Sequence, residues 1–69
     1  MNIFSERLKE LRKEKSMTLN QVSTALSMPL RTYANYEQGK RQPSLETLGL
    51  LCDFYDVSAD YLIGRTDSY

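Results

Sequence analysis

The sequence predicts an all-α fold, a compact bundle of five short helices. Apolar residues recur at helical spacing, and no segment shows the alternation of a strand. Capping residues, prolines and glycines mark where each helix begins and ends. With 69 residues, the chain is expected to form one domain over residues 1–69. Each helix is too short to be stable alone, so packing between helices must hold the domain together.

The first helix is expected from Ser5 to Lys15. Phe4, Leu8 and Leu11 are spaced i, i+4 and i+7, and charged residues occupy most positions between them. This spacing is typical of an amphipathic helix with one face in the core.

A second helix is expected to begin after Thr18. Thr18 and Gln21 have the spacing of a capping box, in which each side chain bonds an otherwise unpaired backbone N–H. The helix must end near Ser27, because Pro29 disfavours helical geometry in the residue before it. Only about two turns fit between these positions.

A third helix is expected from Pro29 to about Glu37, closed by Gly39. At about 100° per residue, one side of it carries Leu30, Tyr33, Tyr36 and Glu37, and the other carries Arg31, Thr32, Ala34 and Asn35. The tyrosine side is expected to pack and the other side to be exposed. Two short helices joined by a tight turn, the second with an exposed polar face, form the helix-turn-helix arrangement that inserts a helix into the DNA major groove.

The remaining helices follow from two serine caps. Ser44 caps a fourth helix to about Asp56, and Ser58 caps a short fifth helix, Ala59–Ile63, that stops at Gly64. Residues 65–69 are expected to form a short frayed tail. The expected core comprises Leu8, Leu11, Val22, Leu26, Tyr33, Tyr36, Leu45, Leu48, Leu51, Cys52, Tyr55 and Leu62.

Composition excludes several classes of protein. Cys52 is the only cysteine and histidine is absent, which excludes an internal disulfide and argues against a metal site. Without histidine, a nucleophile environment or a phosphate loop, we expect neither an enzyme nor a cofactor. No secretion signal or membrane-spanning apolar run is present, so we expect a cytoplasmic protein with no membrane partner.

Charge is divided unevenly along the chain. Residues 1–41 carry eight basic and four acidic side chains, a net +4, whereas residues 42–69 carry one basic and five acidic side chains, a net −4. The basic part is suited to a polyanion. An accidental distribution over a solvated surface is the alternative interpretation.

Three separated segments resemble the lambda-repressor-like, Cro-type family of helix-turn-helix regulators, also called the XRE family. They are Leu8-x-x-Leu11-Arg12, the run from Thr32-Tyr33-x-x-Tyr36-Glu37 through Gly39-Lys40-Arg41-x-Pro43-Ser44-Leu45-Glu46-Thr47-Leu48, and Val57-Ser58-x-Asp60-Tyr61-Leu62-x-Gly64-Arg65. The resemblance spans nearly the whole chain. It implies a bacterial or phage transcriptional regulator, a repressor, that binds a palindromic duplex-DNA operator as a homodimer with its third helix in the major groove.

The resemblance implies that Arg31 and Asn35 reach base edges, and the helical wheel places both on the exposed face. Arginine pairs with guanine and asparagine with adenine in the major groove. Thr32 on the same face is a further candidate for base contact. Leu30 has two interpretations: contact with a thymine methyl group or cover of the core, of which we favour the core.

Phosphate contacts are expected from the start of the second helix and from the loop after the third, namely from Thr18, Asn20, Gln21, Lys40 and Arg41. The family often has glutamine where this chain has Leu19, so Asn20 is expected to take over a contact.

Two further features follow from the resemblance. Arg12 and Glu37 occupy positions that form a partly buried ion pair; the alternative is two solvated charges. Ser27 replaces the usual turn glycine, and we expect it to adopt a left-handed backbone conformation at some cost.

A second apolar stripe on the fourth and fifth helices is a candidate dimer or partner surface. Its residues are Leu50, Phe54, Ala59, Asp60 and Ile63. Packing within the chain explains them equally well. This surface supports an alternative function, a protein-interaction module such as an antitoxin, which binds a toxin, or the target of an antirepressor.

Overall fold

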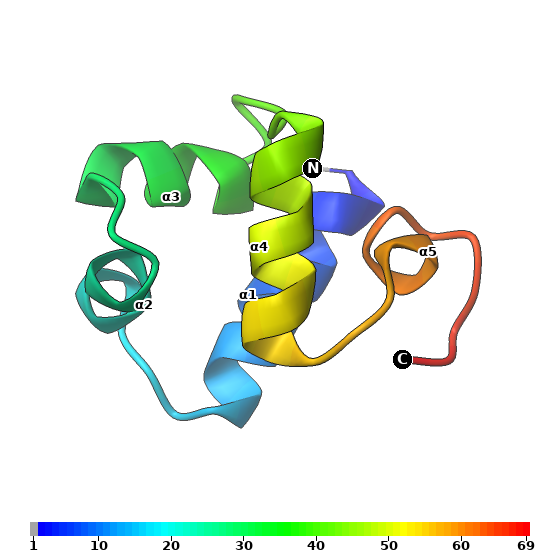
Figure 1. Ribbon diagram of the computed structural model, residues 1–69. Coiled ribbons are helices and arrows are strands. Elements are labelled where there is room, and N and C mark those ends of the chain that lie inside the picture. The colour runs from blue at the N-terminus through cyan, green and yellow to red at the C-terminus, as the bar shows by residue number, and fades with distance from the viewer. Residues whose placement is uncertain (1) are drawn as a thin grey trace.

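The computed structural model describes residues 2–69, which contain five helices and no strand (Figure 1). The predicted all-α fold is confirmed. The helices are α1 (Ile3–Glu14), α2 (Leu19–Ala25), α3 (Leu30–Glu37), α4 (Leu45–Tyr55) and α5 (Ala59–Leu62). Each lies within two residues of its predicted bounds, because local capping signals determine where these helices begin and end.

The helices form two groups around the centre of the molecule. In Figure 1, α2 and α3 lie on one side of α1 and α4, and α5 lies on the other side. α1 packs against both α3 and α5, α2 packs against α3, and α4 packs against α5. α1 therefore joins the helix-turn-helix of α2 and α3 to the rest of the domain.

Each helix contributes one apolar side chain with no exposed area to a single core. These side chains are Leu8, Val22, Tyr33, Leu51 and Leu62. Fully burying a large apolar side chain contributes about 1.5–3 kcal/mol. Because these five side chains meet in one cluster, displacing any one helix would expose apolar side chains of the other helices to water.

The prediction of the core is wrong at Leu45, which is 87% exposed. Leu45 is the first residue of α4 and, at about 100° per residue, lies about 120° around the helix from buried Leu51. Leu45 was predicted to be buried because its i, i+3 spacing to Leu48 is typical of core residues on one helix face. Three other predicted core residues, Leu26, Leu48 and Cys52, pack at the edge of the core and are only partly buried.

All five helices end in a left-handed residue immediately after the last turn, namely Ser16, Ser27, Gly39, Asp56 and Gly64. At the end of α2, the N–H of Met28 donates to the Ser23 carbonyl at 3.0 Å and the N–H of Ser27 to that of Thr24 at 3.1 Å. This pair of bonds is a Schellman motif. Ser27 has a φ of 56°, the left-handed conformation expected for this turn.

Residues 65–69, expected from the sequence to form a frayed tail, contact the rest of the domain in the structure. The Tyr69 hydroxyl donates to the Glu14 carboxylate at 3.0 Å, and its ring lies edge-on to Tyr61 with 4.7 Å between centroids. The Ser58 N–H donates to the Tyr69 carbonyl at 2.6 Å. The tail has no helical periodicity, and its contacts join residues that are far apart in the sequence, so no local sequence pattern predicts them.

Candidate nucleic-acid interface

The start of α2 is held by the predicted capping box. Thr18 Oγ1 accepts from the Gln21 N–H at 3.1 Å, and Gln21 Oε1 accepts from the Thr18 N–H at 2.8 Å. Both side chains are exposed. The capping bonds use only acceptor atoms of these side chains, so the Thr18 hydroxyl hydrogen and the Gln21 amide N–H groups remain available to donate to another molecule.

The turn between α2 and α3 is short and well supported. Ser23 is 2% exposed, and its hydroxyl donates to the Asn20 carbonyl at 3.0 Å. Pro29 occupies the N-cap position of α3 with extended geometry, which its fixed φ favours. Exposed Asn20 is thus tied to the buried side of its own helix through its backbone, and its side chain faces solvent.

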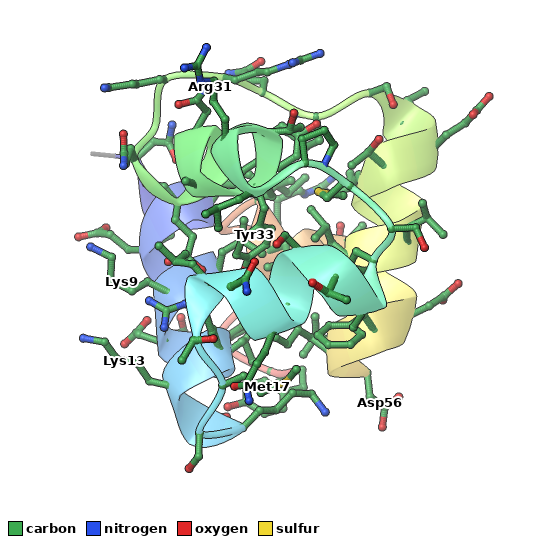
Figure 2. The ribbon with its side chains drawn as sticks, turned by 90° about the vertical axis from the view of Figure 1, so that its left-hand side faces the viewer. Lys9, Lys13, Met17, Arg31, Tyr33 and Asp56 are labelled. Atoms are coloured by element: carbon green, nitrogen blue, oxygen red, sulfur yellow. The ribbon has the colours of Figure 1, made fainter. Side chains whose placement is uncertain are left out.

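α3 has a buried side and an outward side. Tyr33, Tyr36 and Glu37 are buried, Arg31 is exposed, and Thr32 and Asn35 are partly buried. Figure 2 shows Arg31 extending outward from one end of α3 while Tyr33 points into the body of the molecule. The structure therefore places Arg31 on the outward side of α3 and leaves Thr32 and Asn35 partly accessible.

Leu30 does not cover the core, and the interpretation we favoured for it is wrong. Its side chain is 46% exposed. The helical wheel places it on the side of Tyr33, but Leu30 is the first residue of α3 and has no preceding helical turn beside it.

The inward side of α3 contains a pair of tyrosines that joins it to α4. The hydroxyl oxygens of Tyr33 and Tyr55 lie 2.6 Å apart, and these side chains are 0% and 6% exposed. Burial raises the pKa of Tyr33 far above its ordinary value and raises the pKa of Tyr55 to about 12. The Tyr33 hydroxyl thus bonds to a tyrosine 22 residues away in the sequence, a pairing with no local signal.

Arg12 and Glu37 form a bidentate ion pair between α1 and the end of α3. Arg12 Nε lies 2.8 Å from Glu37 Oε2 and Arg12 Nη2 lies 3.1 Å from Oε1. The Glu37 side chain is 3% exposed and the Arg12 side chain 15%. Hydrogen bonding to Glu37 raises the pKa of the Arg12 guanidinium. Arg12 Nη1 also donates to the Met17 carbonyl at 3.0 Å, so one guanidinium holds the segment before α2 and the end of α3.

Lys40 is fixed at the end of α3 through its backbone. Its N–H donates to the Asn35 carbonyl at 3.0 Å, and the N–H of Gly39 donates to Tyr36 at 3.3 Å. Gly39 has a φ of 74°, a conformation that glycine adopts at little cost. The side chains of Lys40 and Arg41 are exposed, next to the helix that carries Arg31 and Asn35.

The predicted partner surface is divided in the structure. Leu50 is 53% exposed and Ile63 45%, whereas Phe54 is partly buried, edge-on to Tyr55 at 4.9 Å and 5.3 Å from Lys15 Nζ. Ile63 borders a shallow hollow of about 340 Å³ whose other apolar lining residues are Ile3, Phe4, Pro43 and Leu48. Ala59 and Asp60 are exposed on α5.

The chain offers little for other kinds of site. Within residues 2–69, no group of three or more histidine, cysteine, aspartate or glutamate side chains lies close enough to hold a metal ion. No helix in the described part of the chain is long and apolar enough to cross a membrane. Burial raises the pKa of the Cys52 thiol, which lowers its reactivity.

The sequence model of the Helix-turn-helix family matches residues 8–62. The chain belongs to this family, in its XRE type. This confirms the resemblance drawn from the three separated motifs. The matched residues run from α1 to the end of α5 and contain both helices of the helix-turn-helix.

The helix-turn-helix chain is similar to several named regulators. It is 47% identical over 60 residues to the HTH-type transcriptional regulator AnsR of Bacillus subtilis, covering 87% of this chain and 52% of AnsR. It is 30% identical over 66 residues to the cryptic phage CTXphi transcriptional repressor RstR of Vibrio cholerae, covering 96% of this chain and 60% of RstR. The chain thus spans about half the length of AnsR.

A solved structure has the same fold. The crystal structure of a transcriptional regulator from Listeria innocua superposes with a TM-score of 0.82 at 32% identity, covering 96% of this chain and 62% of that chain. The five-helix arrangement of the helix-turn-helix chain is therefore shared over nearly its whole length.

Proposed function

We propose that this chain is a sequence-specific duplex-DNA-binding transcriptional regulator, a repressor, that places α3 in the major groove. One observation carries the proposal: α3 exposes Arg31 and leaves Thr32 and Asn35 partly accessible, while buried Tyr33 and Tyr36 hold its other side in the core. The similar proteins AnsR and RstR are named as a transcriptional regulator and a transcriptional repressor, which supports a regulatory and non-enzymatic role.

Base reading is assigned to the outward residues of α3. Arg31 donates to O6 and N7 of guanine, and Asn35 pairs with N6 and N7 of adenine; a good bidentate pair contributes about 1–3 kcal/mol of discrimination. Thr32 contacts a neighbouring base edge. The 46% exposure of Leu30 favours its contact with a thymine methyl group.

Phosphate binding is assigned to two groups of exposed side chains at either end of the helix-turn-helix. Thr18, Asn20 and Gln21 lie at the start of α2, and Lys40 and Arg41 follow α3. Such contacts set the position of a protein on the duplex without reading its sequence.

The repressor acts as a homodimer on a palindromic operator, because two-fold symmetry in the protein matches two half-sites about one helical turn apart. The exposed residues Leu50, Ala59, Asp60 and Ile63, with partly buried Phe54 at the border, form the surface assigned to the second copy. Occupying a promoter represses transcription without a cofactor or metal. We place the protein in the cytoplasm of a bacterium, encoded there or by a phage.

A second candidate function is protein interaction through α4 and α5, as an antitoxin or as the target of an antirepressor. The observation that favours it is the 53% exposure of Leu50. Leu50 lies on α4, a helix whose charged side chains are all acidic. Co-purification of a stoichiometric protein partner that is lost in Leu50→Asp, together with unchanged DNA binding, supports this function.

Titration of variants with two duplexes tests the proposal. The duplexes are one recovered by site selection and a scrambled duplex of the same length. Arg31→Ala and Asn35→Ala are expected to lower the affinity ratio of the two duplexes about tenfold or more each. Lys40→Ala is expected to weaken both equally and to flatten the salt dependence. A ratio that is unchanged in both α3 variants contradicts the proposal.

A further inference from the structure

Two lysines of α1, Lys9 and Lys13, are not among the residues proposed to contact DNA bases or phosphates. No ion pair within residues 2–69 involves either lysine, although the same helix contains Glu6, Glu10 and Glu14. Figure 2 shows both side chains extending from the same edge of α1, away from the body of the molecule. These two charges are therefore available to another molecule.

The neighbouring contacts place this edge of α1 beside the helix-turn-helix. Arg12 bonds to Glu37 at the end of α3 and to the Met17 carbonyl before α2. At about 100° per residue, Lys9 and Lys13 lie about 60° and 100° from Arg12 on one side of the helix. On that side of the helix they are thus the first charged residues beyond Arg12, which contacts α3.

The acidic residues of α1 lie farther from α3. On the same wheel, Glu6 and Glu10 are about 120° and 160° from Arg12. The carboxylate of Glu37 lies on α3 itself, but its charge is neutralised by Arg12. The edge of α1 nearest the helix-turn-helix is therefore basic, and a polyanion that lies against α2 and α3 meets the lysines before the glutamates.

The spacing of the lysines suits a phosphate backbone. Four residues of helix separate them by about 6 Å along the axis, and duplex DNA has a phosphate every 3.4 Å of axis along each strand, so the two ammonium groups can neutralise separate phosphates. Lys13 is followed after five residues by Thr18, the first of the phosphate-binding residues assigned to α2. The lysines continue that group along the edge of the molecule.

We propose that Lys9 and Lys13 of α1 bind DNA phosphates flanking the bases read by α3, and so extend the DNA contact beyond the helix-turn-helix. The inference rests on the proposed function. The contacts are electrostatic, so they add affinity and salt dependence and leave the preferred sequence unchanged.

Salt-dependent titration of Lys9→Gln, Lys13→Gln and the double variant tests this inference. The probe is the duplex recovered by site selection with the wild-type chain, titrated between 50 and 200 mM salt. Each lost phosphate contact is expected to reduce the magnitude of the slope of log K against log [salt] by about 0.9. Both single variants should show this reduction, and the double variant about twice as much, with the preference over a scrambled duplex retained.

Lys15→Gln is the matched control. It removes the same charge from the same helix, but Lys15 Nζ lies over the Phe54 ring at 5.3 Å, on the other side of Arg12. Its slope is expected to equal that of the wild type. A double variant with the wild-type slope, or a control with the same loss as the double variant, overturns the inference while the proposed function stands. A wild-type chain that binds no duplex overturns both.

Discussion

Arg12 of α1 and Glu37, the last residue of α3, are joined by two hydrogen bonds of 2.8 and 3.1 Å. The same guanidinium donates to the carbonyl of Met17, the residue before the N-cap of α2. A side chain outside both helices therefore ties the end of α3 to the segment that precedes α2. Because α3 carries the outward residues Arg31 and Asn35, this ion pair positions the surface that we propose reads DNA.

Breaking one partner of this pair is expected to destabilise the domain. Glu37→Gln leaves the guanidinium of Arg12, 15% exposed, without its carboxylate, and should lower the free energy of unfolding by about 3 kcal/mol. The double variant Arg12→Met, Glu37→Leu should lose less, since no unpaired charge remains. Urea denaturation at pH 7 measures both. Glu10→Gln on exposed α1 surface is the control, and equal small losses for Glu10→Gln and Glu37→Gln would show that the pair is merely solvated.

Stability is expected to fall at alkaline pH because of Tyr33 and Tyr55. The pKa of Tyr55 is raised to about 12 and that of Tyr33 further, so the folded state holds both phenolic protons more tightly than the unfolded state. Their contribution is complete below the unfolded pKa of about 10 and is lost as the pH rises towards 12, by about 1.4 kcal/mol per pH unit for each tyrosine. Urea denaturation between pH 8 and 11.5 should show this fall. The Tyr33→Phe, Tyr55→Phe double variant should show a much shallower fall, and a fall as steep as in the wild type argues against the tyrosine pair as its cause.

Two glycine-to-alanine substitutions are expected to have opposite effects. A Cβ at Gly49 in α4 meets nothing within 4 Å, so Gly49→Ala should stabilise the helix by about 0.5–1 kcal/mol. Gly64 has a φ of 87°, and a Cβ there would lie 2.6 Å from Ile3 Cγ2, so Gly64→Ala should destabilise the domain. Thermal unfolding distinguishes the two. Shifts of the same sign would contradict the structure around Gly64.

The tail of residues 65–69 is expected to be released by substitution of Arg7. The Arg7 guanidinium donates to the carbonyls of Tyr61 and Thr66 and lies 4.2 Å from the centroid of the Tyr61 ring. Arg7→Met should accelerate hydrogen exchange at the Ser58 N–H, which donates to the Tyr69 carbonyl. Asp67→Asn is the control: the Asp67 side chain is fully exposed, and its pair with Arg7 adds little. Equal exchange in Arg7→Met and the wild type would mean that Arg7 does not hold the tail.

Local signals in the sequence predict most of this fold. The capping box of Thr18 and Gln21 and the serine caps Ser44 and Ser58 are all present in the structure, because each involves residues three positions apart. The left-handed turn at Ser27 was also expected from its place in the motif. Helical periodicity likewise separates the buried tyrosines of α3 from its outward residues.

Contacts between distant residues could not be predicted in this way. The hydrogen bond between Tyr33 and Tyr55 spans 22 residues, and that between Tyr69 and Glu14 spans 55. Periodicity also fails at helix ends, where Leu30 and Leu45 have the spacing of core residues and yet are exposed, since a first residue has no preceding turn beside it. The DNA surface that we propose along α1 also has no motif of its own, because it depends on the tertiary contacts of Arg12.

Selection of binding sites from a random duplex-DNA pool tests the central claim most directly. The wild-type chain and the Arg31→Ala, Asn35→Ala double variant are compared at low and at physiological salt, after thermal unfolding has shown that both are folded. We predict that the wild type enriches inverted repeats with half-sites about one helical turn apart, and that the double variant loses this motif while retaining weak, salt-sensitive binding. The same motif enriched by both proteins, or no enrichment by the wild type even at low salt, would contradict the assignment of α3 as the reader of DNA sequence.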